Sequence, residues 1–180
     1  MWKLFTPKGR LFADKSGLAT VEFAVASSVL TVGLLNGLEV ARWSLQKMEV
    51  ANAVHSATLA AWNACDTKHL PAKSSCTGLT SAINSGLQTT SLGTAVTLAS
   101  GYPTEGYYCI NSSTGVLTNV ANYDQTKPAN CSSQGDASHS PGDYVVIQAS
   151  YTYTPLISSN LTVGSRLQST LTSTGYIRLQ

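Results

Sequence analysis

The chain has 180 residues, which is enough for one modest domain with an additional segment. Only 11 % of the residues are charged, and Ser, Thr, Asn and Gly are abundant after the first third of the chain. Such a composition is not typical of a cytosolic enzyme and fits an exported β-rich domain. The first 17 residues carry a net charge of +3 and the remainder −1, so the body of the chain has no basic face and we expect no nucleic-acid partner.

Residues 1–17 form a short basic leader, and residues 18–38 follow as an apolar stretch with one charge, Glu22. A bilayer core of about 30 Å needs about 20 helical residues, so this stretch predicts a single transmembrane helix. The basic flank predicts that the N-terminus lies in the cytoplasm and the rest of the chain outside. An ordinary secretory signal fits less well, because Glu39 and Arg42 stand where the small residues of a cleavage site are expected.

The helix is expected to continue over residues 39–64 as an amphipathic half, because no Pro or Gly interrupts this segment. Apolar residues spaced by threes and fours form one face, the predicted stripe, which we expect to pack on the protein's own sheet; a coiled-coil seam is the alternative. His55 lies on this face and is interpreted as a boundary packing residue. The predicted stripe consists of Leu34, Leu38, Ala41, Leu45, Met48, Ala51, His55, Leu59 and Trp62.

Residues 65–180 are predicted to form a β-rich domain, which makes the fold class α+β: a long N-terminal helix packed on a small antiparallel sheet. A short helix is expected near residues 78–88, and NSST at 111–114 is typical of a hairpin turn. In the longest strand, one face holds Val145, Ile147, Ala149, Tyr151 and Tyr153. Period-two patterns predict the strands at 94–100, 106–110, 115–120, 143–154 and, as one or two strands, 165–179.

Four cysteines, Cys65, Cys76, Cys109 and Cys131, all follow the apolar stretch. An even number in an exported chain indicates disulfides in an oxidising compartment. Three pairings are possible, and we favour the local pairs Cys65–Cys76 and Cys109–Cys131, because each closes a short loop through turn-rich sequence. A zinc site is disfavoured, because Cys65, His69 and Cys76 make only a loose cluster.

Candidate catalytic groups are few. Asp136, His139 and Asp143 lie close in sequence and suggest a metal or acid–base site, but they stand in a Ser/Gly/Pro loop where polar side chains are ordinarily solvated. No nucleophile motif accompanies the histidines, and the loop lacks the oxygen spacing of an EF-hand. Four tyrosines around a disulfide loop offer surface contacts for a binding module, although we favour core or sheet-face positions for them: Tyr102, Tyr107, Tyr108 and Tyr123.

The start of the apolar stretch carries the most informative pattern. A cut between Gly17 and Leu18 would make Glu22 the fifth residue of the mature chain, followed by Phe23. This arrangement resembles class III signal peptides, which prepilin peptidases cut before the apolar run, so that the helix stays on the product. The amine created at Leu18 can pair with Glu22 of a neighbouring subunit, and intramembrane carboxylates are functional by default. The alternative is an incidental boundary charge on a plain signal anchor.

The segment GLATVEFAVASSVLTVGLLNGLEVARW resembles the opening of the TadE/TadG-like family, pilin-like proteins of tight-adherence (Flp, type IVb) pilus systems. Members show a Gly, a short gap, VEFA, an apolar span, and a Glu or polar residue before Arg. The end of the chain is similar too, in YTYTPL at 151–156 and YIRL at 176–179. The matching N-terminal positions are Gly17, Val21, Glu22, Phe23, Ala24, Glu39 and Arg42.

This resemblance implies a pilin-like fold and the role of a minor pilin or pseudopilin. Because the residues offer no catalytic or metal-binding motif, we also expect no enzymatic activity, cofactor or metal. It implies maturation by a prepilin peptidase. The mature protein would then either stay in the bacterial inner membrane, with residues 65–180 in the periplasm, or be incorporated into an extracellular pilus that mediates surface attachment. Implied partners are other pilin or pseudopilin subunits and the pilus assembly platform. The chain is too short for the large extra domain of some relatives, so the TadE-like role is closer. The alternative is a single-pass membrane-anchored periplasmic binding module or enzyme of unknown substrate.

Overall fold

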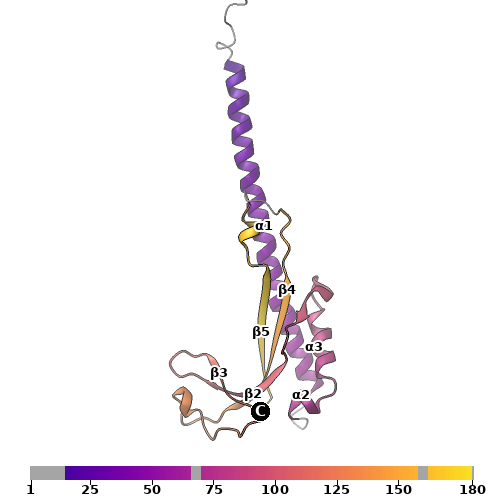
Figure 1. Cartoon of the computed structure of the whole chain (residues 1–180), viewed down its shortest axis with the longest axis vertical. Coiled ribbons are helices and arrows are strands. Elements are labelled where there is room, and N and C mark those ends of the chain that lie inside the picture. The colour runs from indigo at the N-terminus through magenta and orange to yellow at the C-terminus, as the bar shows by residue number, and fades with distance from the viewer. Residues whose placement is uncertain (1–14, 66–69, 158–161, 180) are drawn as a thin grey trace, which may run out of the picture. The chain divides into compact units, whose positions relative to one another are not determined.

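The computed structural model of the chain describes residues 15–65, 70–157 and 162–179, and its architecture is α+β (Figure 1). Most of the predicted leader, and His69, lie outside the described residues. A long N-terminal helix and a small antiparallel sheet are both present, as predicted. The helices are α1 (Lys15–Ala64), α2 (Ala72–Ser75) and α3 (Leu79–Leu87), and the strands are β1 (Thr97–Leu98), β2 (Thr104–Ile110), β3 (Leu117–Asn122), β4 (Gly142–Thr152) and β5 (Thr170–Arg178).

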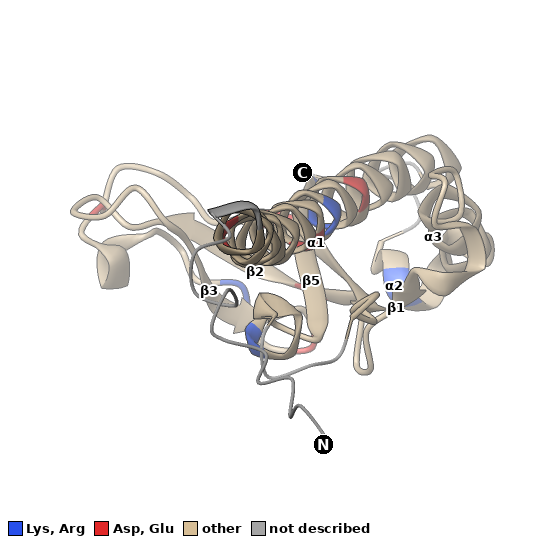
Figure 2. Cartoon of the chain, turned by 90° about the horizontal axis from the view of Figure 1, so that it is seen from above, with Lys and Arg blue, Asp and Glu red and all other residues tan. Residues whose placement is uncertain are grey.

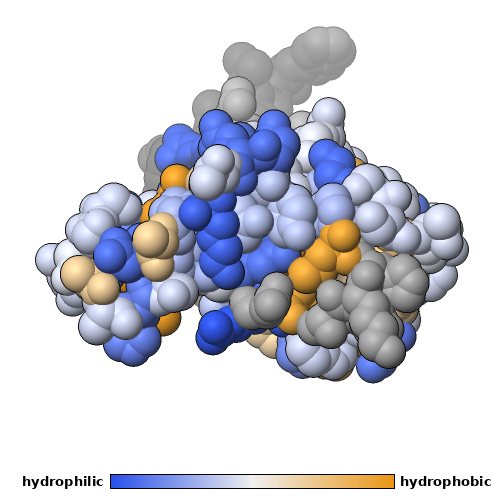
Figure 3. All heavy atoms as spheres, turned by 90° about the horizontal axis from the view of Figure 1, so that it is seen from below, coloured by the Kyte–Doolittle hydropathy of each residue, from blue (hydrophilic) through white to orange (hydrophobic). Residues whose placement is uncertain are grey.

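The chain divides into two compact units. Unit 1 is the chain up to Arg42 with Pro155–Leu167, and unit 2 is Trp43–Thr154 with the chain from Gln168. Charged residues are sparse along the ribbon (Figure 2). Most described residues in the view of Figure 3 are hydrophilic, in contrast to the apolar start of α1.

Strand β4 is the centre of the sheet in unit 2. β5 pairs with it over nine positions, from Tyr144↔Arg178 to Thr152↔Thr170. β2 and β1 pair with the first and the last part of its other edge, and β3 pairs with β2. All of these pairings are antiparallel, and in Figure 1 β4 and β5 run together along α1.

The core of unit 2 lies between one sheet face and α1. Val145, Ile147 and Ala149 are buried, as predicted for alternate residues of this strand. On β5, Gly175 lies so close to α1 that an added methyl group would be 2.7 Å from Val54 Cγ1. The residues that α1 buries here are mostly small: Val50, Ala53, Val54, Ala57 and Ala61.

The predicted stripe on α1 does not pack on the sheet, so this part of the prediction is wrong. All nine of its residues, His55 included, are exposed, and the large ones are more than half exposed. The helix instead turns its small residues to the domain, because Gly86 of α3 lies against its backbone at Ala57 and Gly175 of β5 lies against its Val54 and Thr58 side chains. The stripe is therefore an uncovered apolar surface, with Leu45 and Met48 at 59 % exposure, Leu59 at 52 % and Trp62 at 53 %.

Other elements differ from the prediction mainly in length. The strand expected at 94–100 shrinks to β1, because residues 93–95 form a 3-10 turn. The last strand begins only at Thr170, after a 3-10 turn at Val163–Arg166. The short helix and the hairpin turn are confirmed; in the turn, the Asn111 side chain accepts hydrogen bonds from the Ser113 and Thr114 amides.

Candidate functional site

The first turns of α1 hold the predicted processing and assembly residues. The helix begins at Lys15, so Gly17 and Leu18 lie within its first turn. Within the described residues, one helix contains a window long and apolar enough to cross a membrane, and the rest of the protein buries none of that window. A protease that cuts after Gly17 therefore has to open this turn, for which a glycine without a side chain is well suited.

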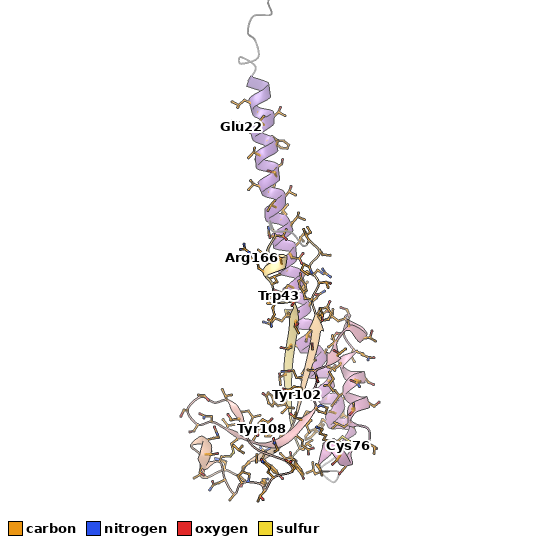
Figure 4. The ribbon with its side chains drawn as sticks, viewed as in Figure 1. Glu22, Trp43, Cys76, Tyr102, Tyr108 and Arg166 are labelled. Atoms are coloured by element: carbon orange, nitrogen blue, oxygen red, sulfur yellow. A yellow bond between two sulfur atoms is a disulfide. The ribbon has the colours of Figure 1, made fainter. Side chains whose placement is uncertain are left out.

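Glu22, which is labelled in Figure 4, and Phe23 lie one turn further along α1. Both side chains are exposed, Phe23 to 74 %, in a helical stretch whose apolar residues are exposed as well. Three hydroxyl groups in this stretch donate to carbonyl oxygens three or four residues back, which satisfies them without water: those of Ser27, Ser28 and Thr31. The stretch is thus suited to lipid or to another helix.

Glu39 connects the two segments that carry the family resemblance. Its side chain is 2 % exposed, and its carboxylate accepts the Leu156 amide hydrogen at 3.1 Å (Oε1) and 3.3 Å (Oε2). One turn before it, Asn36 Oδ1 accepts from the Val163 amide at 2.6 Å. A side chain at Gly164 would collide with Pro155 and Glu39, so the segment packs closely on the helix within unit 1. The family resemblance includes Glu39 among its positions, but the hydrogen bond from the Leu156 amide to Glu39 could be found only in the fold.

The Glu39→Ala variant is expected to release the segment at Leu156. A hydrogen bond to a charged group contributes roughly 1.5–3 kcal/mol, so hydrogen exchange of the Leu156 amide should become about 10–100 times faster. Hydrogen-exchange mass spectrometry of peptides that contain residues 155–157 measures this. Glu39→Gln keeps an acceptor oxygen and should have a smaller effect, whereas equal exchange in wild type and Glu39→Ala would contradict the anchor.

Both disulfides join the pairs favoured from the sequence. Cys65 is bonded to Cys76, and Cys109 to Cys131, with Cα–Cα distances of 5.8 and 5.7 Å. The first bond links the end of α1 to the end of α2. The second holds the loop between β3 and β4 against β2.

The three groups that lie close in sequence at the end of that loop do not form one site. His139 Nδ1 is 2.6 Å from Asp136 Oδ2, and the Ser138 hydroxyl bonds the same carboxylate at 2.6 Å. The bonds from the Ser138 side chain and amide, with a smaller contribution from His139, hold the pKa of Asp136 at about 2. Among the described residues, no group of three His, Cys, Asp or Glu side chains is placed to hold a metal ion.

Asp143 is buried rather than solvated, contrary to the prediction for this loop. It lies in β4 opposite Tyr107, is 1 % exposed, and neither carboxylate oxygen has a hydrogen-bond partner among the described residues. Burial, reinforced by the Glu105 carboxylate and opposed by the Lys127 ammonium, raises the pKa of Asp143 to about 6. Glu105 itself is bonded to the Ala72 and Lys73 amides at 2.8 Å.

The four predicted tyrosines are half-buried, but only Tyr107 and Tyr108 lie in a strand, β2; Tyr102 precedes this strand and Tyr123 lies in the turn after β3. Tyr107 stacks on Tyr123 with ring centroids 5.3 Å apart. Because Tyr107 of β2 pairs with Asp143 of β4, these two side chains lie on the same face of the sheet. Burial, with the neighbouring Tyr107, raises the pKa of Tyr123. Tyr108 lies on the opposite face and contacts Tyr144 and Tyr176, two rings that the sequence did not single out.

No family model, no curated protein and no solved structure matches the chain.

Proposed function

We propose that the chain is a minor pilin or pseudopilin that takes part in the assembly of a tight-adherence (type IVb) pilus and in surface attachment. The observation that carries the proposal is the start of α1, an exposed apolar stretch with a single carboxylate, Glu22, placed five residues after Gly17. An anchor that served only to hold the domain in a bilayer would gain nothing from this charge, which is costly in lipid.

Two further features support the proposal. The Glu39–Leu156 hydrogen bond gives a physical reason for the joint occurrence of VEFA…E…R and Y-x-x-x-P-L, because the second segment docks on the first. The predicted stripe of α1 is left uncovered by the domain, which suits a protein whose helix packs on helices of other subunits. Its partners are then the prepilin peptidase, pilin or pseudopilin subunits, and the assembly platform.

In this proposal the chain inserts in the bacterial inner membrane with its N-terminus in the cytoplasm and the domain in the periplasm. Cleavage between Gly17 and Leu18 leaves a new amine at the start of the helix. Glu22 lies about 6 Å further along the axis, near the positive end of the helix dipole. In an assembly, this carboxylate pairs with the Leu18 amine of a neighbouring subunit and sets the axial register.

Processing is tested by mass spectrometry of the chain expressed with and without a prepilin peptidase. We expect loss of residues 1–17 only when the peptidase is present, a mature N-terminus at Leu18, and no cleavage of a Gly17→Leu variant. An intact Met1 in cells with active peptidase would contradict the processing step, and would favour the membrane-anchored binding module or enzyme.

The assembly role is tested with Glu22→Val in the same cells. The variant should insert and be cut, but should no longer co-purify with pilin subunits after crosslinking. Ser28→Val is the matched control, because it also replaces an exposed polar side chain of the same helical stretch. If Glu22→Val assembles as well as Ser28→Val, Glu22 is only a boundary charge.

A further inference from the structure

A cavity of about 300 Å³ lies on the sheet face that points away from α1, under the loop between β3 and β4. Tyr108, Tyr144 and Arg178 reach it from three strands, β2, β4 and β5. Tyr144 pairs with Arg178, and Tyr108 pairs with Gly142, so their side chains share one face. Figure 4 shows Tyr108 on β2, where that strand enters the hairpin with β3.

Aromatic rings form one side of this cavity and continue beyond it. The Tyr108 ring meets Tyr144 edge-on at 5.7 Å and Tyr176 at 6.1 Å between centroids. Tyr176 is 48 % exposed and Ile110, which also lines the cavity, is 60 % exposed. Tyrosine combines an apolar ring with a polar end, and is therefore suited to ligands that are partly apolar and partly wet.

The opposite wall is a loop that is fixed by its own bonds. The Cys109–Cys131 disulfide ties it to β2, and the Cys131 amide donates to the His139 carbonyl at 2.8 Å. The Asp136 amide in turn donates to the Cys131 carbonyl at 3.1 Å. A wall that is ordered before binding loses little entropy when a ligand arrives, which favours affinity for small ligands.

The polar groups of this wall can both donate and accept. Because three hydrogen bonds from Ser138 and His139 keep Asp136 ionised, the carboxylate only accepts, and His139 Nδ1 carries the hydrogen. When the imidazole carries its one hydrogen on Nδ1, the other ring nitrogen, Nε2, is an acceptor. Ser140 and Arg178 also line the cavity, and their side chains carry hydrogen-bond donors.

Size and charge narrow the class of ligand. The volume is at the lower end of the range for ligand pockets, roughly 300–1,000 Å³, and suits a single ring. The positive charge of Arg178 and the negative charge of Asp136 balance, so a charged ligand would gain little electrostatic attraction from the cavity. A pyranose ring has apolar C–H faces for the tyrosines, and a rim of hydroxyls that need both donors and acceptors.

We propose that this cavity, the tyrosine pocket, binds one neutral sugar residue of a glycan chain. Tyr108 and Tyr144 contact the C–H face of the sugar, His139 Nε2 accepts from one hydroxyl, and Arg178 donates to another. Tyr176, on the exposed side, offers a second ring to the next sugar of the chain. The proposal is independent of pilus assembly, because all of these residues belong to unit 2 and none to the start of α1.

The test uses the full chain in phosphatidylcholine nanodiscs, which avoids sugar-based detergents. Saturation-transfer NMR and titration are carried out with the methyl β-glycosides of glucose, galactose and N-acetylglucosamine, and with glucuronic acid as a charged comparison. We expect at least one neutral glycoside to bind with a Kd on the order of 1 mM. The absence of saturation transfer from all three, or a preference for glucuronic acid, overturns the proposal.

Variants locate the site. Tyr108→Ala should weaken binding at least about tenfold, through loss of the ring contact. His139→Ala should weaken it about threefold, and its side chain is 77 % exposed, so the fold is not at risk. Thr172→Ala, an exposed change on the same face of β5 but outside the cavity, is the control and should bind as wild type. If Tyr108→Ala does not fold, Arg178→Gln is used in its place. Wild-type affinity both in His139→Ala and in the Tyr108 or Arg178 variant would show that the sugar does not bind in this cavity, and would overturn the proposal.

Discussion

At pH 7.5 the Asp143→Asn variant is expected to unfold at a temperature about 5–10 °C higher than the wild-type chain, whereas at pH 4 the two should unfold together. The buried Asp143 carboxylate has no hydrogen-bond partner among the described residues and faces a second carboxylate, Glu105. Ionising it inside the domain is unfavourable, and an amide of the same shape removes the charge. Thermal unfolding followed by circular dichroism, on the full chain in nanodiscs, measures the difference.

The pH window follows from the sign of the shift. The folded pKa of Asp143 is about 6, above the unfolded value of about 3.9, so the folded state holds its proton more tightly. The resulting stabilisation is complete below pH 3.9 and is lost as the pH rises through 6. Two pKa units correspond to about 3 kcal/mol at most. Asp136, with a pKa near 2, stays ionised throughout this window and does not interfere.

Asp124→Asn is the matched control for Asp143→Asn, because it removes an exposed carboxylate from the adjacent loop. We expect its unfolding temperature to follow that of wild type at both pH values. If Asp143→Asn is no more stable than wild type at pH 7.5, the carboxylate has a partner that lowers its pKa in solution.

The long helix could be predicted from the sequence, but the side that it buries could not. Periodicity reports that apolar residues share a face, and α1 has two such faces beyond the membrane segment. One carries large residues such as Leu59 and Trp62, and the other carries small ones such as Ala57 and Ala61. The size of its residues favoured the first face as the core. The second face is required, because α3 approaches the helix backbone at Ala57 and β5 approaches the Val54 and Thr58 side chains. Only the glycines on the partner elements resolve this choice.

Local chemistry was predicted better than contacts between distant segments. Short loops rich in turn residues indicated both disulfides. The alternation of apolar residues along β4 predicted Val145, Ile147 and Ala149 as buried, which they are. The surroundings of Asp143 depend on which residues of β2 stand opposite it, and no local pattern contains that register. The same holds for Tyr144 and Arg178, which become a site only when β5 pairs with β4.

Gly86→Ala is expected to destabilise the chain by about 3 kcal/mol, although alanine is ordinarily the better helix former by about 1 kcal/mol. Gly86 lies in α3 directly against α1, where an added methyl group would be 2.5 Å from Ala57 Cα and 2.8 Å from Ala57 N. Because these are backbone atoms of a helix, they cannot shift without the rest of the helix. The added methyl group therefore forces α3 and α1 apart. Chemical unfolding of the full chain measures the loss.

Ser85→Ala provides the comparison that isolates this contact. It introduces the same residue at the neighbouring, exposed position of α3, where helix propensity alone decides, so a gain of up to about 0.5 kcal/mol is expected. Opposite signs for Gly86→Ala and Ser85→Ala would establish that the small face of α1 is the buried one. Two gains of similar size would mean that α3 does not press on Ala57. Because the large, exposed stripe is the opposite face of the same helix, this pair of variants also decides which surface of α1 is open to partner subunits.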